Sequence, residues 1–350
     1  MAATISKKRT LDSFFTPKSS KKARLIEDIH HEPANTAENQ LQPSSQHSTY
    51  PFPIPHLRPQ ITNELSAIPA SSGKEINNKP DLDLLYFQPY ISRKISTPLF
   101  NFLRSSLFFY RVKYKIKRGA IETEINTPRY TTVFGVDSTS LFTADGALID
   151  SITKSPIPSD RYSTCQPRPI PSCLDELRKL TEDCTGASYN FCLVNYYASG
   201  VDSISYHSDD ERFLGLSPSI ASLSLGANRD FCMKHKPVPP STNMPPPSAT
   251  PLLSKHKDSD KPLKLPLTSG DMVLMRGSTQ AKWLHSIPKR KGAEADEGRI
   301  NITFRRALEK GGTENYYRYN VGSGVVWKWD GAAGEMREWV GVKEVEVLGR

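Results

Sequence analysis

Four short, apolar-rich runs constrain the fold of this chain more than any other feature of the sequence. They occupy residues 191–194, 220–225, 272–275 and 300–304, and segments containing glycine or proline separate them. Runs of this length between turn residues are typical of strands in an antiparallel double sheet. We therefore expect a jelly-roll core.

Two segments upstream of these runs are predicted to be helices. Hydrophobic residues recur at helical spacing in residues 91–110, as at Leu99, Phe102 and Leu103. Residues 172–181 form the second expected helix, with Ser172 as a plausible N-cap and Glu176 near the capping-box position. Residues 111–116 alternate like a strand. The expected class is mainly β with flanking helices.

Composition divides the chain into parts. Residues 1–80 lack hydrophobic periodicity and are expected to be a disordered basic tail. Residues 81–310 are expected to be the globular domain. Residues 236–262 are rich in Pro, Ser and Lys and are predicted to be a surface insertion between strands. Residues 311–350 form a C-terminal extension rich in Tyr and Trp, for which the sequence suggests no role.

Charge, cysteine spacing and the absence of long apolar runs indicate the kind of partner and the cellular compartment. The formal net charge of +9 fits a polyanionic partner such as nucleic acid. The five cysteines include no C-x-x-C pair, which argues against a disulfide framework or a zinc ribbon and favours reduced thiols in the cytosol or nucleus. No apolar run reaches the ~18 residues of a membrane span, and the N-terminus lacks the apolar stretch of a secretory signal. We expect no membrane association.

His207, Asp209 and His285 are the candidate metal ligands. His207 and Asp209 are two residues apart, a spacing that places both side chains on one face at the end of a strand. Two histidines and one carboxylate are the ligand set of non-haem iron(II) oxygenases, and they leave room for a 2-oxo acid and O2. A His-x-Asp pair alone is a weak signal, and His285 alone could be a core histidine.

Residues 299–305 strengthen this interpretation. Arg299, Asn301, Thr303 and Arg305 alternate with apolar residues, so they share one face of a strand. Two arginines on an inward face are costly unless anions pair with them. A dicarboxylate such as 2-oxoglutarate supplies such anions, and arginine suits a bidentate carboxylate clamp. The alternative is an edge strand whose polar face is solvated.

Together these residues resemble the AlkB family of iron(II)- and 2-oxoglutarate-dependent nucleic-acid dealkylases, and most closely its nuclear DNA-repair members. The resemblance covers residues 81–308. It rests on residues 128–130, 195–202, 207–211, 220–231 and 299–305, together with His285. It implies a double-stranded β-helix fold.

The resemblance also implies a role for each matching residue. His207, Asp209 and His285 would bind iron. Arg305 would pair with the distal carboxylate of 2-oxoglutarate. The other oxygens of 2-oxoglutarate would be held by Asn195, Tyr197, Arg299 and Asn301. Substrate would be contacted by His207, Arg129, Asp210, Glu211 and a base-stacking aromatic residue, either Tyr162 or Phe134, of which Tyr162 is preferred.

The implied reaction is oxidative demethylation of N-alkylated bases in DNA, of the 1-methyladenine or 3-methylcytosine type. Fe(II), 2-oxoglutarate and O2 take part, and formaldehyde, succinate and CO2 are released. The enzyme would act as a monomer in the nucleus, in repair of alkylated DNA. The alternatives are RNA demethylation and a non-catalytic adaptor that binds DNA or the sliding clamp. The sequence does not rank the alkylated bases, nor single against double strands.

Two further segments favour DNA. Leu11, Phe14 and Phe15 resemble a sliding-clamp-binding peptide, although Lys8 stands where that motif has Gln. Residues 111–124 are expected to form a hairpin in which Tyr114 or Ile116 wedges into a base stack while lysines contact phosphate. The alternative is an ordinary amphipathic hairpin with solvated lysines.

Overall fold

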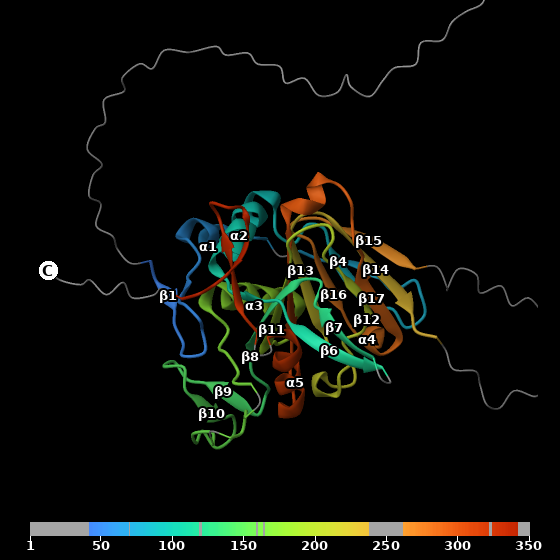
Figure 1. The fold of residues 1–350 in the computed structure, drawn as a ribbon. Helices are drawn as coiled ribbons and strands as arrows, with labels where there is room; N and C mark the ends of the chain where they lie inside the picture. The colour runs from blue at the N-terminus through green and yellow to red at the C-terminus, as the bar shows by residue number, and fades with distance from the viewer. Residues whose placement is uncertain are drawn as a thin grey trace, which may run out of the picture. The chain divides into compact units, whose positions relative to one another are not determined.

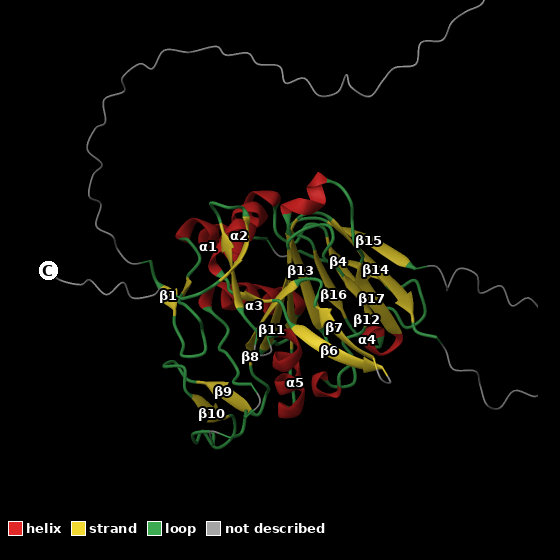
Figure 2. Cartoon of the chain, viewed as in Figure 1, coloured by secondary structure: helices red, strands yellow, loops and turns green. Residues whose placement is uncertain are grey.

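Two antiparallel sheets form the core of the computed structural model (Figures 1 and 2). The structure describes residues 42–69, 71–118, 121–158, 160–163, 165–237, 262–321 and 324–341. Within them, the major sheet has the strand order β20-β19-β5-β8-β11-β18-β13-β16-β4-β3, and the minor sheet has the order β12-β17-β14-β15. The expected mainly β architecture with flanking helices is confirmed.

The four apolar runs all become strands of the major sheet. Its strands are β3 (Lys74–Ile76), β4 (Leu84–Phe87), β5 (Phe109–Tyr110), β8 (Tyr130–Gly135), β11 (Phe191–Tyr197), β13 (Ile220–Gly226), β16 (Met272–Met275), β18 (Arg299–Arg305), β19 (Val326–Asp330) and β20 (Glu335–Glu338). The minor sheet contains β12 (Ile204–His207), β14 (Arg229–His235), β15 (Leu263–Leu267) and β17 (Trp283–Ile287). Separate hairpins are β1 (Ser44–Ser45) with β2 (Ile54–Pro55), β6 (Lys113–Arg118) with β7 (Ile121–Asn126), and β9 (Ser140–Phe142) with β10 (Leu148–Asp150).

Strand β18 lies in the interior of the major sheet, between β11 and β13. All seven of its residues are buried. Asn301 lies opposite Asn195 on β11 and opposite Ser224 on β13, so polar side chains of three strands meet on one inner face. The alternative of a solvated edge strand is therefore wrong.

The α-helices of the described residues are α1 (Pro59–Ser66), α2 (Arg93–Ser106), α3 (Ser172–Thr185), α4 (Thr279–Lys282) and α5 (Lys310–Asn320). Two short 3-10 helices are η2 (Arg212–Leu214) and η3 (Ala293–Glu297). The buried residues of α2 include Ile95, Leu99 and Leu103, which recur at the expected helical spacing. The N-cap of α3 is Pro171 and carries no side-chain cap bond, so the prediction of Ser172 as N-cap is wrong by one residue. The extended backbone of the proline ends the preceding segment and leaves Ser172 inside the first turn.

Residues 42–80 do not form the disordered segment that their composition predicts. Ile54 and Leu57 are buried, and α1 buries Ile61 and Leu65. The Tyr50 hydroxyl donates a hydrogen bond to the Pro169 carbonyl at 2.5 Å. Proline-rich segments show no hydrophobic period, yet single apolar side chains along them can still fill gaps in a neighbouring surface. Residues 1–41, with the clamp-like peptide, lie outside the described residues.

The C-terminal extension joins the domain. Strand β19 pairs with β5 and β20 pairs with β19, so the extension adds two strands at one edge of the major sheet. Helix α5 buries Tyr317, whose hydroxyl donates to the Gly135 carbonyl at 2.9 Å. Most of the expected insertion, residues 238–261, lies outside the described part of the chain. Among the residues that are described, no helix combines the length and apolarity that a membrane crossing requires.

Candidate metal centre

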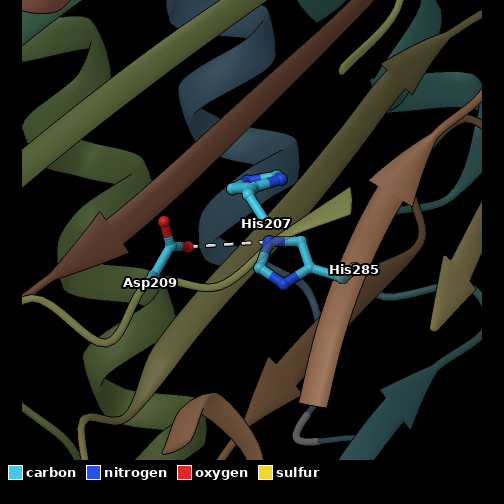
Figure 3. Close-up of side chains that lie close together, drawn as sticks. All are labelled: His207, Asp209 and His285. Atoms are coloured by element: carbon cyan, nitrogen blue, oxygen red, sulfur yellow. Dashed lines mark ion pairs between the residues drawn. The ribbon is translucent and has the colours of Figure 1, made fainter. Parts of the chain in front are cut away.

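The register of the minor sheet brings the three candidate ligands together. Strand β12 ends at His207, which lies directly opposite His285 on β17, although roughly 80 residues separate them in sequence. Figure 3 shows both rings and the Asp209 carboxylate converging on one point. One potential ligand atom of each residue lies within 4.8 Å of the others. The Nε2 atom of His285 is 3.7 Å from Oδ2 of Asp209.

Asp209 lies two residues beyond the end of β12, in the loop that follows the strand. Strand alternation therefore does not place its side chain. Instead, its backbone N–H donates to the side-chain oxygen of Gln280 at 3.0 Å. Gln280 is buried within α4. This residue orients the loop, and no sequence motif indicated it.

Both histidine rings are held in the form that binds metal. Nδ1–H of His207 donates to the Ser205 carbonyl at 2.9 Å, which leaves Nε2 free. Burial lowers the pKa of His207, and burial together with the nearby His207 ring lowers the pKa of His285 to about 3. Neutral imidazoles need not lose a proton before they coordinate a cation.

Arg305 keeps the third ligand ionised. Burial opposes the charged form of Asp209, but the nearby Arg305 guanidinium favours it, and the pKa of the carboxyl is lowered. Nη2 of Arg305 lies 3.0 Å from Oδ2 of Asp209, and Nη1 hydrogen-bonds to the hydroxyl of Tyr316. Both partners of the ion pair are nearly inaccessible to water, so solvent screens their attraction little.

Arg299 is a buried cation without an anion. Its Nη2 donates to the Ser224 hydroxyl at 2.8 Å, while Nε and Nη1 are buried and have no partner. Its guanidinium lies 5.3 Å from the centre of the Tyr197 ring. No carboxylate among the described residues pairs with it, and burial lowers its pKa to about 10. An uncompensated buried guanidinium is costly, so this position suits the carboxylate of a bound molecule.

These groups line one cavity of about 440 Å³. Its volume lies within the ~300–1,000 Å³ range of small-molecule sites. It is lined by the metal-ligand candidates and by Arg129, Asn195, Tyr197, Glu211, Arg299, Asn301 and Arg305, among others. Nε of Arg129 donates to the side chain of Asn195 at 2.8 Å. Burial, followed by the charge of Asp209, raises the pKa of Glu211.

Two expected substrate residues are not among those that line the cavity. Asp210 turns outward and pairs with Lys236 at 2.6 Å. Tyr162 is hydrogen-bonded to Asp137 and Ser140, and it lines a different cavity beside His47. The other candidate, Phe134, is fully buried in the core. The prediction of Tyr162 as the stacking residue is therefore wrong, because distance in sequence from a helix does not say which face a side chain meets.

Helix α5 contributes residues that sequence reasoning missed. Tyr316, Tyr319 and Asn320 line the cavity. They stand three and four residues apart, so they share one helix face. This spacing within the tyrosine-rich extension was the one available signal, but it does not indicate where the helix would dock.

The expected hairpin is present. Strands β6 and β7 pair in register, with Tyr114 opposite Ile125 and Ile116 opposite Thr123. Lys113 and Lys115 are two-thirds exposed, and they pair across the hairpin with Glu124 at 3.9 Å and Glu122 at 2.6 Å. Solvated lysines are thus confirmed, while the wedge role of Tyr114 or Ile116 stays a prediction.

Comparisons with known proteins identify relatives of this chain. The model of the 2OG-Fe(II) oxygenase superfamily matches residues 84–305. The DNA oxidative demethylase ALKBH2 of Arabidopsis thaliana is 31% identical over 242 residues, which cover 68% of this chain and 71% of that protein. Human DNA oxidative demethylase ALKBH2 is 37% identical over 148 residues, 41% of this chain and 50% of that protein. Human alpha-ketoglutarate-dependent dioxygenase alkB homolog 3 is 40% identical over 147 residues, 41% of this chain and 46% of that protein. The chain thus spans about half the length of these two human relatives.

Proposed function

Because the chain belongs to the AlkB family within the 2OG-Fe(II) oxygenase superfamily, we propose that it demethylates N-alkylated bases in DNA. It is a dioxygenase that uses Fe(II), 2-oxoglutarate and O2. Its substrates are bases of the 1-methyladenine and 3-methylcytosine type, and its products are formaldehyde, succinate and CO2. It serves the repair of alkylated DNA in the nucleus. The observation that carries the proposal is one cavity that holds both a His-Asp-His cluster and an unpaired, buried arginine.

The residues present fit an iron(II) ion. His207, Asp209 and His285 supply two neutral nitrogens and one ionised oxygen that converge within 4.8 Å. Iron(II) held by such a set supplies activation of O2 for hydroxylation of an N-methyl group. The protein's own part is to fix the ligands, through the Gln280 bond to the Asp209 backbone and the Arg305 pair with its carboxylate.

The residues also fit 2-oxoglutarate, with one change from the expected roles. Arg305 pairs with Asp209 and therefore lies beside the metal ligands. Arg299 lies at the opposite end of β18 and keeps two free donors. We therefore assign the distal carboxylate to Arg299 rather than Arg305. Asn195, Tyr197 and Asn301 surround the same inner face and hold the remaining oxygens.

The base would enter from the side of Arg129, Glu211 and α5. A base must leave its stack to reach buried ligands, and a damaged base costs less to flip because it pairs poorly. Glu211 lines this side of the cavity, where its carboxyl group can hydrogen-bond to the polar edge of the base. The buried walls around His285 and Arg305 exclude water from the reacting methyl group.

Formaldehyde release tests this function. The full chain would be given Fe(II), 2-oxoglutarate and matched single-stranded DNA, double-stranded DNA and RNA, each carrying 1-methyladenine or 3-methylcytosine. We expect release from methylated DNA and none from unmethylated DNA. Release from RNA alone would favour RNA demethylation. Absence of both release and 2-oxoglutarate consumption would favour a non-catalytic adaptor.

The N-terminal peptide is a separate part of the proposal. Leu11, Phe14 and Phe15 would bind a sliding clamp as one hydrophobic plug. A pull-down with purified clamp should therefore retain the full chain but lose a Phe14→Ala/Phe15→Ala variant. Equal retention of both proteins would remove the clamp from the list of partners.

A further inference from the structure

A second cavity adjoins the metal cavity, and its walls come from parts of the chain that are far apart in sequence. One wall is formed by residues 111–115, which lead into and include the start of β6, and another by residues between Tyr317 and Glu338. Thr49, Cys165, Gln166 and Arg168 complete the lining. We propose that this cleft binds the single-stranded DNA next to the target nucleotide and directs it into the metal cavity. The proposal rests on the proposed function and extends it to the nucleotides beyond the reacting base.

The size and exposure of the cleft suit a polymer. Its volume is about 1180 Å³, above the ~300–1,000 Å³ of sites that enclose a small molecule. Lys113 and Lys115 at its edge have side chains that are 67% exposed. A wide, solvent-open cleft can hold several linked nucleotides and let the chain run out at both ends.

The charge of the cleft is complementary to phosphate. Its lining contains the cations Lys113, Lys115, Arg168 and Arg318, against the single carboxylate Glu338. A fifth cation of the lining, Arg111, is paired with Asp202 at 3.2 Å. The glutamates that pair with the two lysines lie on β7 and do not line the cleft. Exposed pairs of this kind contribute little, so a phosphate can replace the carboxylate at small cost.

Arg168 adds a preformed anion position. Its Nη2 donates to the Tyr110 hydroxyl at 2.8 Å, but Nε and Nη1 are buried and unpartnered. The rings of Phe108 and Tyr110 lie 5.3 and 4.9 Å from its guanidinium and hold it in place. No carboxylate of the described residues pairs with Arg168 or with Arg318. A planar guanidinium that keeps free N–H donors suits a phosphate.

Tyr319 links the cleft to the metal cavity. It lines both, and it is 63% exposed, so it has no packing role in the fold. Trp327, also on the cleft wall, is half-buried against Tyr130. Cations interleaved with accessible aromatic rings are typical of surfaces that bind single strands, where bases stack on the rings and phosphates follow the charge.

This wall lies beyond the segment that the superfamily model covers. That segment ends at Arg305, whereas Arg318, Tyr319 and Trp327 follow it. The C-terminal extension therefore gives this chain one side of the cleft and the residue at its junction with the metal cavity.

The test measures binding of a fluorescein-labelled, unmethylated single-stranded oligonucleotide to the full chain at several salt concentrations. We expect Arg318→Ala and Tyr319→Ala each to weaken binding by roughly tenfold, and Tyr319→Phe to preserve it. Arg318→Ala should also reduce the slope of log affinity against log salt by about 0.7, the value for one lost phosphate contact on a single strand. The matched control is Arg93→Ala, an exposed arginine on α2 outside the cleft, which should leave binding unchanged.

Several results would overturn the proposal. One is unchanged binding in both Arg318→Ala and Tyr319→Ala, and another is an equal loss in Arg93→Ala. A third is an acidic peptide that binds more tightly than the oligonucleotide and loses affinity in the same variants. Because the oligonucleotide is unmethylated, binding is measured without turnover. If instead the proposed function is wrong, the wild-type chain should release no formaldehyde from a methylated trinucleotide.

Discussion

The guanidinium of Arg305 lies 3.0 Å from the carboxylate of Asp209, and both side chains are almost fully buried. Arg305 raises the ionised fraction of that carboxylate, and in return Asp209 raises the pKa of Arg305 although burial opposes it. The pair thus prepares a negatively charged candidate metal ligand inside the protein. It also makes the metal centre and the stability of the fold depend on the same two residues.

We expect His207→Ala and Asp209→Ala both to abolish turnover but to differ in stability. Each removes one of the three candidate metal ligands. Only Asp209→Ala also leaves Arg305 buried without its partner, which typically costs about 3–5 kcal/mol. Binding of Mn(II) and urea unfolding of the metal-free proteins check this. Normal 2-oxoglutarate consumption by either variant, with iron supplied, would disprove the site assignment.

Arg299→Gln should raise the KM for 2-oxoglutarate. Loss of a charged partner for a buried carboxylate typically costs about 2–5 kcal/mol, or roughly 30-fold and more in KM. Arg305→Gln should instead weaken metal binding, because Arg305 faces Asp209. The two variants are compared by initial rates over a range of 2-oxoglutarate and iron concentrations. If Arg305→Gln alone raises the KM for 2-oxoglutarate, the assignment of the two arginines is reversed.

Tyr316→Phe tests the contribution of the C-terminal extension to the centre. The substitution removes only the hydroxyl that hydrogen-bonds to Arg305. Hydrogen bonds to charged groups contribute about 1.5–3 kcal/mol, so the free energy of unfolding should fall by that order. Tyr317→Phe is the matched control, since its hydroxyl bonds to the Gly135 carbonyl. Both variants should lose stability, but only Tyr316→Phe should change the kinetics with 2-oxoglutarate or iron; identical kinetics in the two would make Tyr316 purely structural.

The metal-free protein should lose stability as the pH falls from about 7 to 5. Burial lowers the pKa of His285 to about 3, whereas an unfolded histidine has a pKa near ~6.5. Between these values the unfolded chain binds a proton that the folded chain does not, so acid favours unfolding by up to ~1.4 kcal/mol per pH unit. His285→Gln should give a shallower dependence in urea unfolding with a chelator present. An unchanged slope would show that the ring is protonated in the folded protein.

Substitutions in the hairpin should act on duplex DNA more than on single strands. An apolar wedge helps only when a base must leave a stack. Tyr114→Ala and Ile116→Ala should therefore slow demethylation of double-stranded DNA selectively, while Thr123→Ala, on the opposite strand, should not. Rates on both DNA forms at one salt concentration decide this. Equal losses on the two forms would mean that the hairpin is a general binding surface.

The sequence by itself determined four strands of the major sheet and most residues of the candidate site. The apolar runs at β11, β13, β16 and β18 and the alternation of Arg299, Asn301, Thr303 and Arg305 are local patterns, and they persist in the structure. Such patterns record which side chains face inward, because the strand period depends only on the backbone.

The tertiary structure decided which inward faces meet. The β12–β17 register placed His285 opposite His207, and Gln280 oriented Asp209 from outside any strand. Docking of α5 brought Tyr316 to Arg305, whereas Tyr162 turned into a separate cavity. Residues 42–69 packed on the domain although they have no hydrophobic period. These contacts join segments far apart in the chain, and they are fixed by packing and by pairing of buried polar groups, which a local pattern does not encode.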